Sequence, residues 1–76
     1  MDKQARLESL RLAKAEAKDQ KQNFLYGAEM ALGKQEFHHV VIYGQRLVMV
    51  EEHILSLMKE IKDLEEQIDE EKKDIL

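Results

Sequence analysis

The 76-residue chain contains no cysteine, no proline and no tryptophan, and only three glycines. Without cysteine it can form no disulfide bond, and metal sites built on thiolates are excluded. Because proline is the residue that most reliably stops a helix, its absence permits long helices. A chain of this length buries only about 60% of its unfolded surface, so a fold this small needs a further source of stability. With disulfides excluded, we expect that source to be association with a partner.

Long apolar runs and catalytic motifs are also missing. No uninterrupted run approaches the roughly 18 apolar residues of a membrane span. The first residues are charged, so we expect no signal peptide and an intracellular, cytoplasmic location. The chain has no glycine-rich phosphate loop, no G-x-S-x-G sequence and no cysteine nucleophile. We therefore expect a protein that is not an enzyme and that uses no cofactor.

The second half of the chain carries apolar residues with a period of seven. The first series consists of Val40, Leu47, Ile54, Ile61, Ile68 and Ile75, and the second, three residues further on, of Tyr43, Val50, Leu57 and Leu64. This spacing keeps one apolar ridge of a helix against one partner, as in a coiled coil. β-branched residues in the first series, with leucine in the second, favour two parallel helices. The predicted partner-binding residues are Tyr43, Leu47, Val50, Ile54, Leu57, Ile61, Leu64 and Ile68.

The composition, rich in Ala, Leu, Lys and Glu, predicts helices, and the phase of the apolar stripes predicts a turn between two of them. Asp2 suits an N-cap, and Gly33 stands where a left-handed residue would end the first helix. The first apolar stripe ends at Ala31, and the ridge begins nine residues later at Val40. Nine residues rotate a helix by a net angle of roughly 180°, so on one straight helix the stripe and the ridge would lie on opposite sides. A turn removes this change of face, whereas the alternative is a single rod about 110 Å long. We predict one domain over residues 1–76, with a helix over about 2–32, a turn over about 33–36 and a helix over about 36–75.

The two ends of the chain carry opposite charge. Residues 1–22 have six basic and four acidic side chains, giving +2, whereas residues 51–76 have four basic and ten acidic side chains, giving −6. An antiparallel hairpin would set the basic arm beside the acidic one. This favours the hairpin only modestly, because exposed ion pairs contribute about 0–1 kcal/mol each.

A turn centred near residue 34 also predicts which residues meet. Gly27 would lie beside Gly44, which suggests close contact between the two backbones. The residues from about Asp63 onward would extend past the start of the first helix. Ile68 and Ile75 could then be covered only by another chain.

Between Phe37 and Met58 the apolar residues form a broader set than a two-stranded seam requires. A helix contacted on two sides, by its own hairpin partner and by a second subunit, would need such a surface. We therefore predict an all-α antiparallel hairpin with a long heptad-bearing second helix that forms a coiled-coil or four-helix-bundle dimer. In a parallel dimer Arg46 could meet Glu51 of the partner, but Glu60 would face Glu65, so antiparallel pairing and a different partner chain stay open.

Metal and nucleic-acid sites receive little support from the sequence. His38 and His39 point about 100° apart on a helix, and His53 lies roughly 21 Å from His39, so one chain cannot bring the three to one metal ion. The acidic residues 65–71 have no Asp-rich calcium loop around them and are interpreted as a solvated helix face. Four acidic residues interrupt the basic N-terminal arm, and no aromatic residue is interleaved with it, so nucleic-acid binding is the least favoured alternative.

Residues 24–50 resemble a single tetratricopeptide hairpin. Ala28 fits the small position of the first helix of that repeat, Phe37 the aromatic that opens the second, and Val40 and Leu47 the packing positions. The chain departs from the repeat because Val40 and Leu47 replace alanines, Gln35 replaces the turn glycine and no proline follows. The resemblance implies a receptor for a partner peptide. The residue pattern favours a non-catalytic oligomerisation or adaptor module, acting as a homodimer or with another helical protein, and the peptide receptor is the alternative.

Overall fold

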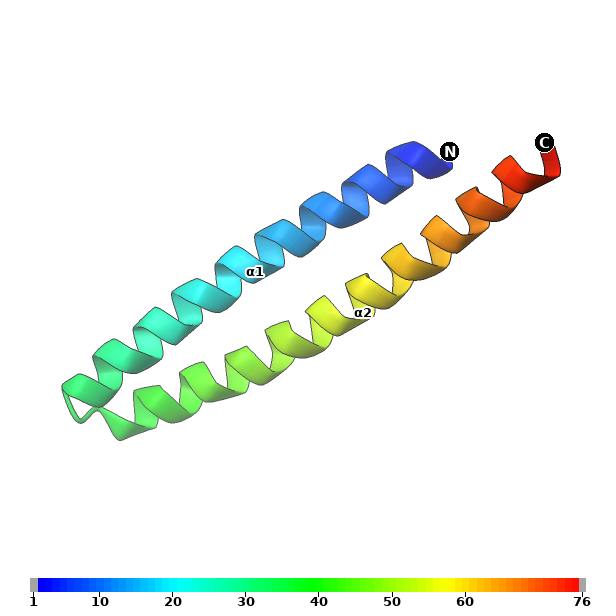
Figure 1. Cartoon of the computed structure of the whole chain (residues 1–76). Helices are drawn as coiled ribbons and strands as arrows, with labels where there is room; N and C mark the ends of the chain where they lie inside the picture. Colours follow the sequence, from blue (N-terminus) through cyan, green and yellow to red (C-terminus); the bar gives the residue numbers. More distant parts are fainter. Residues whose placement is uncertain (1, 76) are drawn as a thin grey trace.

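The structure, a computed structural model that describes residues 2–75 with side chains up to Lys73, is an antiparallel hairpin of two helices (Figure 1). Helix α1 spans Lys3–Gly33 and helix α2 spans Phe37–Ile75. The described residues measure 61 Å by 17 Å by 15 Å, far shorter than a single rod would be. The predicted all-α hairpin is therefore confirmed. Ile75, the last member of the heptad series, lies outside the described side chains.

Helix α1 begins at the predicted cap. The backbone of Asp2 is extended, with φ −63° and ψ 133°, and its Oδ1 accepts a hydrogen bond of 3.2 Å from the backbone N–H of Gln4. The backbone carbonyl of Asp2 accepts the N–H of Arg6 at 3.1 Å and so starts the helical pattern. The carboxylate also places a negative charge at the positive end of the helix dipole.

Helix α1 ends differently from the prediction, which placed a left-handed residue at Gly33. None of the three glycines has a positive φ, and the left-handed residue is Gln35, with φ 60°. The helix continues because the N–H of Lys34 still bonds to the carbonyl of Met30 at 3.2 Å. The N–H of Gln35 then bonds to Leu32 O at 3.0 Å, and that of Glu36 to Ala31 O at 2.9 Å. These two bonds define a Schellman cap, whose left-handed position falls two residues after Gly33.

The core lies between the helices in two clusters. The cluster near the chain ends consists of Leu7, Ile61, Leu64 and Ile68. The cluster in the middle consists of Ala17, Val50, Ile54 and Leu57. Leu10 packs against both clusters. Each aliphatic side chain buried in this way contributes about 1.5–3 kcal/mol. From the antiparallel register we also predict that Leu7 and Leu10 meet Ile61 and the residues around Met58. Leu7 does share a cluster with Ile61 and Leu10 packs against that cluster, whereas Met58 is 45% exposed.

The expectation that only another chain could cover Ile68 is wrong. Its side chain is 8% exposed and lies in the cluster of Leu7. The chain between the helices is only three residues long, so the 31 residues of α1 run beside a similar length of α2. The overlap therefore reaches Ile68 instead of ending near Asp63.

The predicted contact between Gly27 and Gly44 is also wrong, because Gly27 lies against the ring of Tyr43. A Cβ atom at Gly27 would meet the ring of Tyr43, whereas one at Gly44 would meet nothing within 4 Å. Tyr43 belongs to a small aromatic cluster in which its ring centroid lies 6.5 Å from that of Phe24. The guanidinium carbon of Arg46 lies 5.9 Å from both centroids, within cation–π range.

Among the side chains that the structure describes, three ion pairs join the basic helix to the acidic one, as the charge distribution predicts. Lys3 pairs with Glu71, Arg11 with Glu65 at 3.1 Å and Lys21 with Glu51 at 2.6 Å. All six side chains are more than one-third exposed, so each pair contributes only about 0–1 kcal/mol. The pairs agree with the antiparallel orientation, and the apolar core supplies most of the stability.

Candidate interaction surface

The predicted partner-binding residues all face α1 of the same chain. The six from Val50 to Ile68 are 5–8% exposed, and Tyr43 and Leu47 are half-buried. The heptad ridge is thus covered within the hairpin, and a second chain could reach it only if α1 moved away. Contact of these eight residues with another chain stays a prediction.

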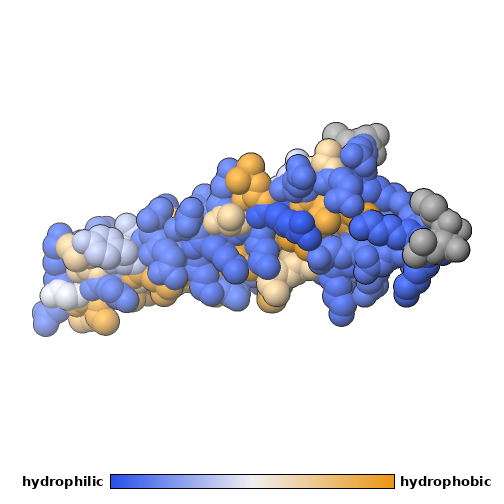
Figure 2. Space-filling model, turned by 45° about the horizontal axis from the view of Figure 1, so that its top comes forward, coloured by the Kyte–Doolittle hydropathy of each residue, from blue (hydrophilic) through white to orange (hydrophobic). Residues whose placement is uncertain are grey.

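A second set of apolar side chains is exposed. Among the described residues the large ones are Leu12, Tyr26, Met30, Leu32, Phe37, Val41, Ile42, Val48, Met49, Leu55 and Met58. Seven of them belong to α2 between Phe37 and Met58, the segment in which the sequence has its broad apolar set. Figure 2 shows one side of the hairpin, on which hydrophobic groups come into view along the lower edge of the half that contains the turn. Clustered exposed apolar groups of this kind mark interaction surfaces.

Three of these side chains form a stripe along α2. Val41, Val48 and Leu55 are seven residues apart, and each follows a member of the buried ridge by one residue. One residue turns a helix by about 100°, so the stripe runs along the flank of α2, outside the contact with α1. The three side chains are 59%, 60% and 57% exposed. In the sequence this stripe is a third seven-residue series, which follows the series of Val40, Leu47 and Ile54 by one residue. The partner-binding prediction did not include it.

Helix α1 adds two leucines to the same side. Leu25 lies beside Val48 in a shallow hollow, which is also lined by Lys21, Leu47, Glu51 and Glu52. Leu32 follows Leu25 by seven residues and Val41 precedes Val48 by seven, so in an antiparallel pair Leu32 and Val41 lie at one level, closer to the turn. The five residues Leu25, Leu32, Val41, Val48 and Leu55 are called the Val48 face below.

The opposite edge of the hairpin also has a hollow. Its hollow is lined by Gln20, Phe24, Arg46, Met49, Val50 and His53. Met49 is 69% exposed, and although it is the neighbour of Val48 it opens to this other edge. Three apolar and three polar or charged side chains line this hollow, and Met49 is not part of the seven-residue stripe of Val41, Val48 and Leu55.

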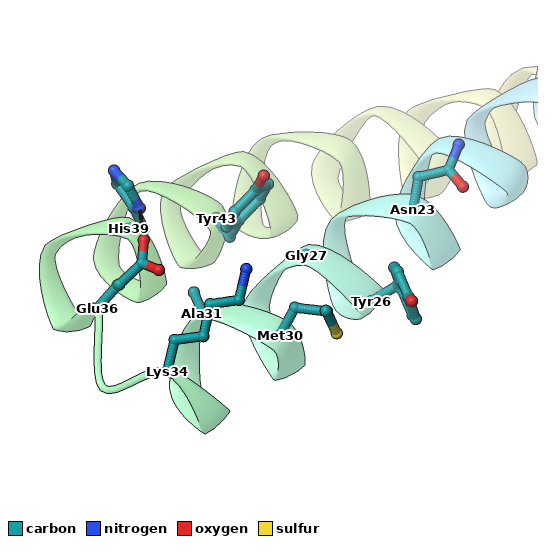
Figure 3. A pocket seen from close by; sticks show the side chains of 9 residues that line it. All are labelled: Asn23, Tyr26, Gly27, Met30, Ala31, Lys34, Glu36, His39 and Tyr43. Carbon is teal, nitrogen blue, oxygen red and sulfur yellow. Dashed lines mark hydrogen bonds and ion pairs between the residues drawn. The ribbon is translucent and has the colours of Figure 1, made fainter.

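A third hollow lies close to the turn (Figure 3). Glu36, which precedes the first residue of α2, points toward His39, and its Oε2 lies 2.7 Å from Nδ1 of that histidine. Its backbone carbonyl accepts the N–H groups of His39 at 3.0 Å and Val40 at 3.2 Å, so Glu36 begins the hydrogen-bond pattern of α2. Across the side chains up to Lys73, no three His, Asp or Glu residues come together as a metal-binding group.

Comparison of the chain with models of protein families, with curated proteins and with solved structures gives no match. Neither helix, over the residues described, combines the length and hydrophobicity that crossing a bilayer requires.

Proposed function

We propose that the protein is a non-catalytic assembly module whose hairpin associates with a second helical chain, above all another copy of itself, through the Val48 face. The observation that carries the proposal is the exposed stripe of Val41, Val48 and Leu55, which repeats every seven residues beside a ridge that is already covered. A soluble monomer gains nothing from such a stripe, whereas a helix packed on two sides requires it. The resulting assembly is a four-helix core made from two hairpins.

The size of the face agrees with reversible association. Covering the exposed part of each of its aliphatic side chains contributes about 1–2 kcal/mol, and two copies bring ten such side chains together. This total, about 10–20 kcal/mol, is of the same order as the roughly 4–15 kcal/mol that association costs in lost freedom, so the net stabilisation is modest. We therefore expect a dimer that dissociates at about micromolar concentration.

Sedimentation equilibrium of the intact chain and of a paired variant tests the proposal. The wild-type chain is expected to change from monomer to dimer with rising concentration. Val48→Glu combined with Leu55→Glu should stay monomeric with an unchanged helical circular dichroism spectrum, because both side chains point away from the core.

The matched control removes exposed apolar side chains elsewhere. Met49→Glu combined with Leu12→Glu changes two residues that are 69% and 62% exposed but lie outside the Val48 face, and this variant should still dimerise. A wild-type chain that is monomeric up to hundreds of micromolar, or a control that dissociates as readily as the paired variant, contradicts the proposal.

A receptor for an apolar helix of another protein is the second candidate function. The hollow between Leu25 and Val48 favours it, because a groove between two helices can hold a third. The tetratricopeptide resemblance of residues 24–50 implies the same role. A chain that stays monomeric and binds an amphipathic helical peptide in a Val48-dependent manner would decide for the receptor.

A further inference from the structure

We propose that two copies of the chain pair antiparallel through the Val48 face, with Val48 on the two-fold axis and Val41 of each copy packed against Leu55 of the other. The inference rests on the proposed self-association and specifies its geometry. Four observations support it: the spacing of the stripe, its extent along α2, the charges beside it, and a glycine that the hairpin itself does not require.

The stripe is symmetric about Val48. Val41 precedes Val48 by seven residues and Leu55 follows it by seven, so an antiparallel pair of α2 helices centred on Val48 brings these two together twice. Leu25 shares the hollow at Val48 and therefore lies at the level of the axis. The two Val48 and two Leu25 side chains then form the central layer of the four-helix core.

The extent of the exposed apolar set matches this pairing. In an antiparallel pair centred on Val48, Phe37 of each α2 helix lies opposite Lys59 of the other. The two α2 helices therefore overlap from Phe37 to Lys59. The exposed apolar side chains of α2 run from Phe37 to Met58, which is nearly the same interval. Beyond it, as far as Lys73, the exposed positions of α2 carry polar or charged side chains, beginning with Lys59 and Glu60. The length of α2 that such a partner covers is thus the length that carries apolar groups.

The charges next to Val48 select the antiparallel orientation. A parallel pair in register would set Glu51 and Glu52 opposite their own copies, and such like-charge pairs are destabilising. In the antiparallel pair the residues opposite them are Gln45 and Gly44, which carry no charge. The centre of the interface then contains no pair of like charges.

Gly44 provides the fourth observation. A glycine inside a helix costs about 1 kcal/mol relative to alanine, and within the hairpin a Cβ atom at Gly44 would meet nothing within 4 Å. It lies one turn from Val48, in the interval that the partner covers. Without a side chain at this position, the second α2 helix can approach closely beside the contact of Val41 with Leu55.

Because the chain has no cysteine, disulfide trapping of single-cysteine variants tests the geometry directly. Val48→Cys should cross-link with its own copy at least about tenfold faster than Met49→Cys, since only the residue on the axis meets itself at the short distance a disulfide needs. Val41→Cys and Leu55→Cys should each stay uncross-linked alone and should form a mixed disulfide when combined. If all three variants of the stripe cross-link with themselves, the pairing is parallel and the inference is overturned.

Sedimentation of the unmodified chain separates this inference from the proposed function. A wild-type dimer whose Val48→Cys variant cross-links no faster than Met49→Cys leaves self-association standing and overturns the antiparallel geometry. A wild-type chain that is monomeric at every concentration overturns both. Circular dichroism of each cysteine variant confirms that the hairpin is intact.

Discussion

The ring of Tyr43 packs directly on the backbone of Gly27, where a Cβ atom would lie 2.6 Å from Cζ and 2.7 Å from Cε1 of the ring. Cβ atoms do not approach other atoms so closely, so the ring occupies the place that any other residue at position 27 would need. We predict that Gly27→Ala lowers the free energy of unfolding by about 1–3 kcal/mol, because overpacking outweighs the gain in helix propensity. Urea unfolding followed by circular dichroism measures the change.

Two variants show whether the ring is the cause. Gly33→Ala adds a methyl group where nothing lies within 4 Å and φ is helical, so it should leave stability unchanged or raise it by up to about 1 kcal/mol. In a Tyr43→Ala background, Gly27→Ala should become stabilising, because the obstruction is gone. A Gly27→Ala protein that is more stable than wild type would contradict the observed packing.

Gln35 is the residue that adopts the left-handed conformation in the turn. For a residue with a side chain this conformation costs roughly 1–2 kcal/mol, whereas glycine adopts it freely. Gln35→Gly should therefore raise the free energy of unfolding by about 1 kcal/mol, while the hydrogen bonds of the cap are retained. The shift of the urea midpoint at fixed protein concentration is the measurement.

Gln35→Ala serves as the control for this change. It removes the same side chain but keeps a Cβ atom, so it should not stabilise the turn. Equal stabilisation by alanine and glycine would show that the glutamine side chain, and not its backbone conformation, is unfavourable.

Ile54 and Leu55 are neighbours in the chain with opposite environments. Ile54 is 5% exposed and packs in the cluster of Ala17, whereas Leu55 is 57% exposed. At concentrations where the chain is monomeric, Ile54→Ala should lower the free energy of unfolding by about 2–5 kcal/mol, and Leu55→Ala should change it by less than about 0.5 kcal/mol. At higher concentration Leu55→Ala should weaken the dimer. Similar losses of monomer stability for both variants would contradict the assignment of the two faces.

The hairpin could be predicted because local signals agreed. The Asp2 cap and the nine-residue gap between Ala31 and Val40 require only helix geometry, and both predictions are confirmed. The position of the left-handed residue could not be predicted in the same way. Glycine is preferred there, but the helix ends where its hydrogen bonds can be completed, and Gln35 occupies that position. The contact of Gly27 with Tyr43 and the burial of Ile68 beside Leu7 depend on how side chains pack between the helices, which the seven-residue period does not specify.

The candidate surface was harder to predict, for a different reason. A seven-residue period shows that a ridge will be covered by a helix, but it does not show which helix covers it. Ile54 and Ile61 meet the short side chain of Ala17 and the longer one of Leu7, and these residues of α1 form only a thin stripe in the sequence. The ridge was therefore assigned to a second chain. The surface that is open to a second chain is the weaker series of Val41, Val48 and Leu55.

The antiparallel arrangement also predicts the length of the dimer. From Val48 to the end of α2 at Ile75 the helix runs about 40 Å at 1.5 Å per residue, and in the antiparallel pair these segments point in opposite directions from the axis. Small-angle scattering above the dissociation constant should therefore give a maximum dimension of about 80–90 Å. A parallel dimer in register would be close to the 61 Å length of one hairpin, so a particle of dimer mass at that length would contradict the antiparallel pairing. Because the overlap is confined to the half that contains the turn, the acidic ends of both α2 helices would stand apart, and the length should change little with salt concentration.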